Sequence, residues 1–310
     1  MILGLDIGGT NTRFALTDED GSLFTACRVI KSAQFADAER PFQKLASILK
    51  EYIQQAGSPS VEMISAGVPA TVSKDFRTVF CAPNLKSVEG EPVFDGLPVA
   101  DLLSAEMGIP VLVNKDVNNL LACDMVLNHL AGTVVGCYIG TGFGTSVCID
   151  GRFVYGKNGF AMDVGHVSIL GQKGICGCGK EGCIETFASG SALNRLRREY
   201  YPEVPGEELF LRHASDSPVS AFVEACAQLP AFLLTCFDPD YVALGGGVLE
   251  MPGFPMEKLK DLILHYTGKA VASDPPCFIE DARCPERGVI GAACFARAYY
   301  GQGNGGYDPL

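Results

Sequence analysis

Two glycine-rich turns in this sequence carry residue types suited to holding a nucleotide phosphate. The first follows an apolar stretch and combines a carboxylate, two glycines and several hydroxyl and amide side chains. Glycine lets backbone N–H groups approach phosphate oxygens, and the carboxylate could hold Mg²⁺ through water. A plain tight hairpin would use the same glycines, so this turn alone leaves both interpretations open. The candidates are Asp6, Gly8, Gly9, Thr10 and Asn11, with Asp6 as the magnesium ligand.

A second turn repeats this arrangement after another apolar stretch near the middle of the chain. Two such turns in one chain strengthen the phosphate interpretation. A third glycine cluster, after the apolar residues 241–244, could place adenine and ribose against bare backbone, or could be a tight strand-to-helix turn. The candidates in these two segments are Gly140, Thr141, Gly142, Gly144, Thr145, Gly245, Gly246 and Gly247.

Three of the thirteen cysteines lie close together, at positions 176, 178 and 183, and His166 lies ten residues before the first of them. Three thiolates and one imidazole complete a tetrahedral Zn²⁺ shell, and a closed shell of this kind is structural rather than catalytic. Three reduced cysteines in a flexible loop are the alternative, which the spacing disfavours. We therefore predict zinc ligands at His166, Cys176, Cys178 and Cys183.

Asp116 is the candidate catalytic base because it follows a short apolar strand expected at 110–113. An open sheet presents residues at its carboxyl ends to a crevice. A carboxylate there can take the proton of a hydroxyl group that is being phosphorylated. The alternative is an N-cap aspartate at the start of the helix that runs through Leu120 and Leu121.

The composition is that of a globular chain without attraction to polyanions. Hydrophobic residues make up 47% of the 310 residues and charged residues 19%, and the formal charge is −12. This charge disfavours nucleic acid and anionic lipid as partners. No apolar run reaches the roughly 18 residues of a membrane span, and the N-terminal stretch has no basic segment or cleavage signal. We expect a cytoplasmic protein with mostly reduced thiols and with no nucleic-acid or membrane partner.

The hydrophobic pattern predicts the elements that position these residues. Strands are expected at 2–7 and 13–17, after residue 21, at 61–68 and 110–113, in a hairpin from about 132, and at 241–244; helices are expected at about 42–56, 100–107, 189–200, 218–237 and 288–300. Residues 158–183 show no hydrophobic periodicity. Something other than a regular helix or strand must therefore hold this segment in place. Each half opens with a strand, a glycine turn and a strand, which indicates an internally duplicated α/β fold.

Together these features resemble the ROK family of sugar kinases and repressors, within the actin, hexokinase and heat-shock ATPase superfamily. The resemblance runs from Ile2 to about Ala296, and the segment 176–185 matches the family signature C-x-C-G-x-x-G-C-x-E. It implies an actin-like two-domain α/β fold with duplicated mixed sheets. It also implies that both glycine turns grip ATP with Mg²⁺, that a hexose binds nearby, and that the chain forms a homodimer.

The resemblance further implies sugar contacts at matching positions. Two of these positions depart from the family pattern, because Lys115 replaces an asparagine and Asp163 replaces a glutamate. A donor-only cation and a shorter carboxylate would change which hydroxyl groups are reached. The substrate-binding candidates are Gly67, Val68, Pro69, Asn84, Lys115, Asp163, His166 and Glu185.

Within the family, the segments 69–85 and 237–255 and the basic residue at 115 look like the D-allose kinase branch. We therefore expect phosphorylation of the 6-hydroxyl of D-allose. Glucokinase and N-acetylmannosamine kinase are the nearest alternatives. A sugar-responsive transcriptional regulator is an alternative of another class. We disfavour it, because such regulators resemble this chain only after a helix-turn-helix domain, whereas the first phosphate turn here begins at Asp6.

The expected division of the chain follows from the same resemblance. A small N-terminal domain, 1–113, would be completed by the helix 288–300. A large C-terminal domain, 114–287, would carry the zinc-binding loop 158–185. Residues 301–310 are expected to form a flexible tail.

Overall fold

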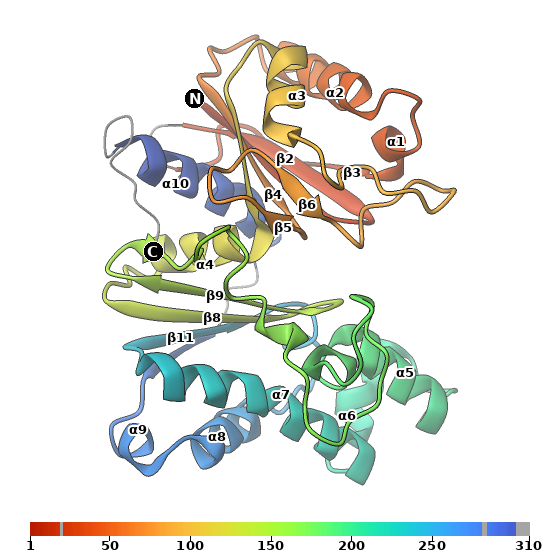
Figure 1. Ribbon diagram of the computed structural model, residues 1–310, viewed down its shortest axis with the longest axis vertical. Helices are drawn as coiled ribbons and strands as arrows, with labels where there is room; N and C mark the ends of the chain where they lie inside the picture. The colour runs from red at the N-terminus through yellow and green to blue at the C-terminus, as the bar shows by residue number, and fades with distance from the viewer. Residues whose placement is uncertain (19–20, 281–283, 302–310) are drawn as a thin grey trace. The chain divides into compact units, whose positions relative to one another are not determined.

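The computed structural model describes residues 1–18, 21–280 and 284–301 (Figure 1). Their contacts group them into two compact units. Over the described residues, the first unit comprises Met1–His129, Arg152–Ala161 and 284–301, and the second comprises Leu130–Gly151 and 162–280. The domain limits expected at 113 and 287 stay a prediction, and residues 302–310 of the expected tail lie outside the described residues.

A mixed sheet forms the centre of the first unit, with the strand order β3-β2-β1-β4-β7. β1 runs antiparallel to β2 and parallel to β4, which is parallel to β7. All residues of β4 are buried, as is typical of a central strand that helices cover on both faces. The strands are β1 (Ile2–Ile7), β2 (Asn11–Thr17), β3 (Arg28–Lys31), β4 (Met63–Val68) and β7 (Val111–Lys115), with a small hairpin of β5 (Thr71–Val72) and β6 (Val79–Cys81), and β10 (Arg152–Phe153).

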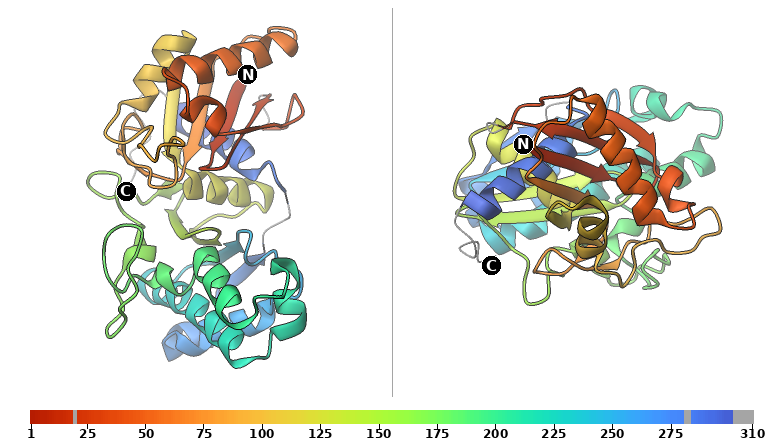
Figure 2. Two further views of the ribbon diagram at one scale, coloured as in Figure 1. Left: turned by 90° about the vertical axis from the view of Figure 1, so that its right-hand side faces the viewer. Right: turned by 90° about the horizontal axis from the view of Figure 1, so that it is seen from above.

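Helices lie on both faces of this sheet, with α2 and α10 on opposite sides (Figures 1 and 2). Leu45 and Leu49 of α2 and Leu103 of α3 join the core against the strands. α10 packs on β1, β4 and α4. Gly291 of α10 lies so close to the carbonyl of Asn119 that no side chain would fit at 291. The helices are α1 (Ala33–Ala36), α2 (Pro41–Gln55), α3 (Val99–Met107), α4 (Asp116–Leu127) and α10 (Arg287–Gly301).

The sheet of the second unit repeats the topology of the first. Its strands follow the order β9-β8-β11-β12. β8 is antiparallel to β9 and parallel to β11, which is parallel to β12. The expected internal duplication is thus confirmed. The elements are β8 (Thr133–Ile139), β9 (Phe143–Ile149), β11 (Tyr241–Gly245), β12 (Cys277–Glu280), α5 (Gly190–Tyr200), α6 (Leu209–His213), α7 (Ser217–Phe237), α8 (Met256–Tyr266), α9 (Lys269–Ser273) and the short helices η1 (Val164–His166), η2 (Ile184–Thr186) and η3 (Gly206–Glu208).

One helix in the described part of the chain, α7, is long and apolar enough to cross a membrane. However, 56% of its most apolar window is buried, and α7 packs against α8, α5 and β8. A helix that is apolar around most of its circumference is expected in a protein core. α7 is therefore a core helix of the second unit.

Candidate active site and metal centre

The carboxyl ends of three parallel strands bring candidate residues of the first unit together. The register pairs Asp6 of β1 with Gly67 of β4, and Gly67 with Asn114 of β7. Asp116 follows at once as the first residue of α4. Residues at the carboxyl ends of neighbouring parallel strands share one edge of a sheet. Asp6, Gly67 and Asp116, far apart in sequence, therefore meet at this edge.

The first glycine turn closes the β1–β2 hairpin and is held by residues at the end of β3. The N–H of Gly8 donates to the Asn11 carbonyl (3.0 Å). Ser32 donates from Oγ to the Gly8 carbonyl (2.6 Å) and from N–H to the Thr10 carbonyl (3.0 Å). Lys31 Nζ donates to Asn11 Oδ1 (2.9 Å). Sequence reasoning missed Lys31, which adds a cation beside a turn predicted to bind phosphate.

Gly9 at the tip of this turn has no room for a side chain. A Cβ atom at position 9 would clash with the backbone carbonyl of Asn84. The chain at Asn84, a predicted sugar contact, therefore passes directly over the phosphate turn, and its side chain is exposed. Only glycine permits this close approach of two backbone segments.

The carboxylate of Asp6 lies beside Arg13 and the start of α10. Arg13 is its register partner on β2, with Nη1 3.6 Å from Asp6 Oδ2. Gly288 packs so closely that a side chain there would meet the carboxylate. Burial raises the pKa of Asp6, while Arg13 and Arg287 oppose the shift. Sequence reasoning missed Arg13, although the hairpin register would have placed it opposite Asp6.

Asp116 is the first helical residue of α4, and Lys115 rather than Asp116 occupies the N-cap position that sequence reasoning offered as the alternative. The Oδ1 atom of Asp116 accepts a hydrogen bond from the N–H of Val117 (2.8 Å). Its pKa is raised to about 7, mainly by burial and next by the charge of Asp6, against the opposing effects of Val117 and Lys115. A general base works best with a pKa near the operating pH. The raised pKa is compatible with the predicted role of Asp116 as a base, and that role stays a prediction.

A buried amide network fixes the start of α4. Asn114 is fully buried, and its Nδ2 donates to Asn119 Oδ1 (3.0 Å). The Asn114 Oδ1 atom accepts hydrogen bonds from Lys115 N–H (2.9 Å), Asn118 Nδ2 (3.2 Å) and Tyr155 OH (3.0 Å). Buried hydrogen-bond networks rigidify their surroundings. This network sets the direction in which α4 leaves β7, and with it the position of Asp116.

Lys115 is buried, with only 6% of its surface exposed. Its Nζ atom donates to the carbonyl oxygen of Ala161 at 2.9 Å. A buried ammonium group requires such a partner, because its desolvation is costly. The basic residue that replaces the family asparagine is therefore an anchored cation next to Asp116.

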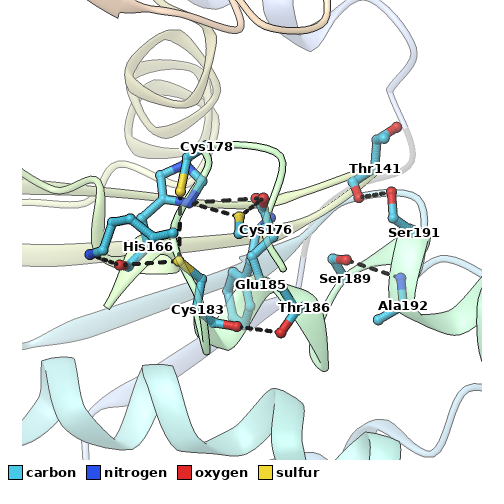
Figure 3. Close-up of polar contacts among 12 residues, drawn as sticks. Thr141, His166, Cys176, Cys178, Cys183, Glu185, Thr186, Ser189, Ser191 and Ala192 are labelled. Atoms are coloured by element: carbon cyan, nitrogen blue, oxygen red, sulfur yellow. Dashed lines mark hydrogen bonds and ion pairs between the residues drawn. The ribbon is translucent and has the colours of Figure 1, made fainter. Parts of the chain in front are cut away.

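The second glycine turn closes the β8–β9 hairpin and is held by the start of α5 (Figure 3). Gly190 N–H donates to the Gly140 carbonyl at 2.7 Å. Ser191 donates to the Thr141 carbonyl from its N–H (3.1 Å) and from its Oγ (2.9 Å). The N–H of Gly140 donates to the carbonyl of Gly142 (3.0 Å). As in the first turn, neighbouring donors take up the carbonyl oxygens.

The third glycine cluster lies beside the second turn. Gly246 has a φ of +97° and packs against the backbone of Ile139, at the end of β8, where a Cβ atom would clash. Gly245 ends β11 and pairs with Tyr138. Sequence reasoning proposed both a nucleotide contact and a tight turn here. The tight turn is present, and the nucleotide contact stays a prediction for Gly245, Gly246 and Gly247.

Two of the predicted phosphate-binding residues take part in the β8–β9 ladder. Gly144 pairs with Tyr138 and Thr145 pairs with Cys137. Thr145 is buried, and its Oγ1 donates to the carbonyl of Met162 (2.8 Å). This hydroxyl therefore fastens the segment that leads into Asp163. Asp163 itself is exposed and directly precedes η1.

The predicted zinc ligands converge in the second unit (Figure 3). Cys178 Sγ lies 3.7 Å from Cys183 Sγ, and Cys176 Sγ lies 3.5 Å from His166 Nδ1. All four ligand atoms lie within 4.8 Å of one another. In a tetrahedral zinc site with bonds of about 2.0–2.3 Å, ligand atoms stand about 3.5–3.8 Å apart. The donor types and their spacing therefore fit Zn²⁺.

Glu185 links this cluster to the second glycine turn. Its Oε2 accepts a hydrogen bond from Phe143 N–H (3.0 Å), and its Oε1 lies 4.0 Å from His166 Nδ1. A side chain at Gly142 would meet the same carboxylate. Glu185 was predicted to contact sugar hydroxyl groups. The sugar contact stays a prediction, and the hydrogen bond from Phe143 ties the loop of the four predicted metal ligands to the start of β9.

The predicted sugar segment Gly67, Val68 and Pro69 ends β4 at the same edge as Asp6 and Asp116. Val68 is fully buried, so only its backbone groups can serve a ligand. Gly67 lies against Asp116 and Asn119, and a Cβ atom at 67 would clash with the Asn119 amide. The first unit thus gathers the candidate base, magnesium ligand and first phosphate turn. The second unit gathers the metal cluster and the other two turns.

Comparison with known proteins identifies the family of this chain. The model of the ROK family matches residues 2–299. A glucokinase from Thermotoga maritima is 24% identical, with 97% of this chain and 98% of that protein aligned. An N-acetyl-D-glucosamine kinase from Vibrio cholerae is 28% identical over 92% of this chain and 93% of that one. The crystal structure of a ROK hexokinase from Thermus thermophilus is 26% identical and superposes with a TM-score of 0.77, covering 97% and 99% of the two chains. The chain therefore belongs to the ROK family, with the actin-like fold of its sugar kinases, and is a carbohydrate kinase of the hexokinase type.

Proposed function

We propose that this chain transfers the γ-phosphoryl group of ATP to the 6-hydroxyl of a hexose, with Asp116 as the general base. The observation that carries the proposal is the position of Asp116. It lies at the carboxyl end of β7, at the same sheet edge as the phosphate turn, with a pKa raised to about 7. Near neutral pH, a large share of such carboxyl groups can accept the proton of the attacking hydroxyl group.

The glycine turns supply positioning and charge stabilisation. In phosphoryl transfer these contributions account for most of the catalysis. Backbone N–H groups of the turns, with the Thr10 and Thr141 side chains, would hold phosphate oxygens. Lys31 adds positive charge next to the first turn. Mg²⁺ bound with ATP would offset phosphate charge, and Asp6 is the carboxylate placed to hold it through water.

The four-residue metal cluster would have a structural role. His166, Cys176, Cys178 and Cys183 fill a tetrahedral shell, which leaves no open position for a substrate. Bound Zn²⁺ would stabilise the loop 166–185 and keep Glu185 in contact with the second turn. His166 Nδ1 faces the cysteines, so its other ring nitrogen stays available for a sugar hydroxyl group.

For the sugar itself we propose D-allose. The segments 69–85 and 237–255 and the basic residue at 115 support this choice. The burial of Lys115 beside Asp116 makes it a fixed donor rather than a mobile surface charge. Allose differs from glucose only in the orientation of the 3-hydroxyl group, so one or two hydrogen bonds decide the preference.

Glucose or an N-acetylhexosamine is the second candidate. The names of the relatives, a glucokinase and an N-acetyl-D-glucosamine kinase, support it. The proposed homodimer rests on the family resemblance, and the proposed cytoplasmic location rests on the sequence pattern; both stay predictions.

A coupled ATP assay over a panel of hexoses tests the proposal. We expect turnover with D-allose at a higher kcat/KM than with D-glucose, N-acetylglucosamine or N-acetylmannosamine. Lys115→Asn should move the preference toward glucose. A wild-type chain that phosphorylates no sugar in the panel would contradict the proposed activity, whereas a preference for glucose would contradict only the choice of D-allose.

A further inference from the structure

Two half-exposed aromatic side chains, far apart in sequence, stand together in the first unit. Phe80 and Phe160 are 47% and 41% exposed. Their ring centroids lie 4.8 Å apart at an interplanar angle of 79°, an edge-to-face contact. Exposed apolar surface on a phenylalanine ring is unfavourable in water, and covering it is favourable. A pair of such rings therefore marks a surface that a ligand can cover.

Phe160 is held in place by contacts of its own backbone neighbours. Gly159 has a φ of +91° and packs against the Val72 carbonyl, where a Cβ atom would clash. The carbonyl of Ala161 accepts the hydrogen bond from Lys115 Nζ (2.9 Å). The Phe160 ring is therefore fixed between two anchors, one of which is the cation next to Asp116.

Phe80 belongs to a hairpin that joins two predicted sugar segments. It lies on β6, which pairs with β5 through Cys81 and Thr71. β5 follows the Gly67–Pro69 segment, and β6 precedes Asn84 by a few residues. Val79 is fully buried, and side chains alternate along a strand, so Phe80 faces away from the core.

We propose that the aromatic pair Phe80 and Phe160 contacts the carbon-bound hydrogens of the hexose and contributes to its affinity. The inference rests on the proposed function, since the pair is bracketed by Lys115, Asn84 and the segment after Gly67. A pyranose ring presents hydroxyl groups at its edge and C–H groups on its faces. The π face of an aromatic ring is negative and attracts the weakly positive C–H groups, and its apolar area is removed from water on contact. Small-molecule pockets usually combine such an apolar surface with a few polar groups that fix the orientation of the ligand.

Steady-state kinetics of single variants test this contact. Phe80→Ala and Phe160→Ala should each raise the KM for the sugar by about tenfold, the scale of a lost apolar pocket contact, and leave the KM for ATP within about twofold. Phe160→Tyr keeps the ring and should restore most of the affinity. Phe24→Ala is the matched control, because Phe24 lies in the same unit with 48% exposure.

The inference is wrong if the two alanine variants match Phe24→Ala, or if the KM values for ATP and sugar rise together. The latter result would show a general loss of structure. A wild-type chain that phosphorylates no sugar would contradict the proposed function instead, and a second measurement then still applies. The chain contains no tryptophan, so Phe160→Trp provides a unique fluorescent probe at this position.

Titration of the Phe160→Trp variant with the best sugar alone should change its emission with a saturable dependence. ATP without sugar should leave the emission unchanged. An emission that responds to ATP but not to any hexose in the panel would overturn the assignment of the aromatic pair to the sugar.

Discussion

The two glycine-turned hairpins of this molecule share one topology but are supported in different ways. In the first, Ser32 and the backbone of Asn84 lie against the turn. In the second, the start of α5 and the carboxylate of Glu185 take these places. Glu185 belongs to the loop that carries the predicted metal ligands, and its Oε1 atom lies 4.0 Å from His166 Nδ1.

The two hairpins therefore differ in what a mutation near them should change. The first hairpin lies at the sheet edge that carries Asp6 and Asp116, so changes there should act on catalysis. The second hairpin depends on a loop that a metal would stabilise, so its shape should depend on metal content. A duplicated fold thus keeps the same turn in both halves, while the candidate base Asp116 and the candidate magnesium ligand Asp6 both lie in the first.

The largest expected effect concerns the base. Asp116→Asn should lower kcat by about 10²–10⁴-fold, because the amide cannot accept the proton of the sugar hydroxyl group. The KM for ATP and the metal content should stay close to the wild-type values. Stopped-time assays of sugar phosphate formation measure the loss. Asp261→Asn, at an exposed position on α8, is the control, and near-native turnover in the Asp116 variant would exclude it as the base.

Metal removal should affect one hairpin and spare the other. Cys178→Ser, or treatment with a strong chelator, removes a ligand or the ion and should lower the melting temperature by several degrees. Hydrogen exchange should then accelerate in residues 140–145 and 166–185 but not in residues 8–12. Cys236→Ser, at an exposed cysteine of α7, is the control. Equal acceleration in both hairpins would refute the proposed dependence of the second turn on the metal loop.

Replacing a glycine by alanine in each turn should change the KM for ATP by different amounts, and this effect is smaller than those above. In Gly9→Ala the new Cβ meets a backbone carbonyl, that of Asn84, whereas in Gly142→Ala it meets the movable carboxylate of Glu185. We expect the KM for ATP to rise about tenfold in the first variant and only about two- to threefold in the second, following the difference in backbone strain. Gly206→Ala, at a glycine outside both turns where a Cβ has free space, is the control and should change little. The reverse order of effects would contradict the proposed packing.

The smallest effect is a pH dependence of stability in the first unit. The pKa of Asp116 is about 7 in the folded chain and roughly 3.9 in an unfolded one, so the folded state holds this proton more tightly. Stability should therefore fall as pH rises from about 4 to 7. Asp116→Asn removes this loss, and it should add about 1–3 kcal/mol at pH 8 but almost nothing at pH 4. Urea unfolding at both pH values measures the difference, and an equal gain at both would show that ionisation of Asp116 is not its cause.

Local patterns in the sequence predicted most of the long elements. The sequence placed α2, α5 and α7 to within a few residues of their observed ends. The strand expected after residue 21 begins only at Arg28. Before it, the N–H groups of Phe24 and Thr25 bond back to the Leu16 carbonyl, so residues 22–27 form no ladder. The short strands β5, β6 and β12 were missed. β5 and β6 have two and three residues, too few for a pattern, and β12 is defined by its pairing with β11.

The candidate site also contains residues that local sequence motifs predicted and contacts that only the fold reveals. The three clustered cysteines and both glycine turns are short local motifs, so their spacing alone made them candidate metal and phosphate sites. Asn114 and the contact between Lys115 and Ala161 depend on which segments the fold brings together. Buried amides carry no sequence signature, since asparagine is more often a loop residue. Only the register of β7 and the course of residues 152–161 reveal their role.

The position of α10 has a consequence for the order in which the protein is made. α10 packs on β1 and β4, and Gly288 touches Asp6, yet this helix follows the whole second unit in the chain. During synthesis on the ribosome, the residues of the second unit up to 280 emerge before the helix that covers the first sheet. The second unit can thus fold while the first still exposes apolar surface, and the edge that carries Asp6 and Asp116 is completed last. A nascent chain that stops before residue 287 would hold both glycine turns but lack the helix that packs against Asp6, the predicted magnesium ligand.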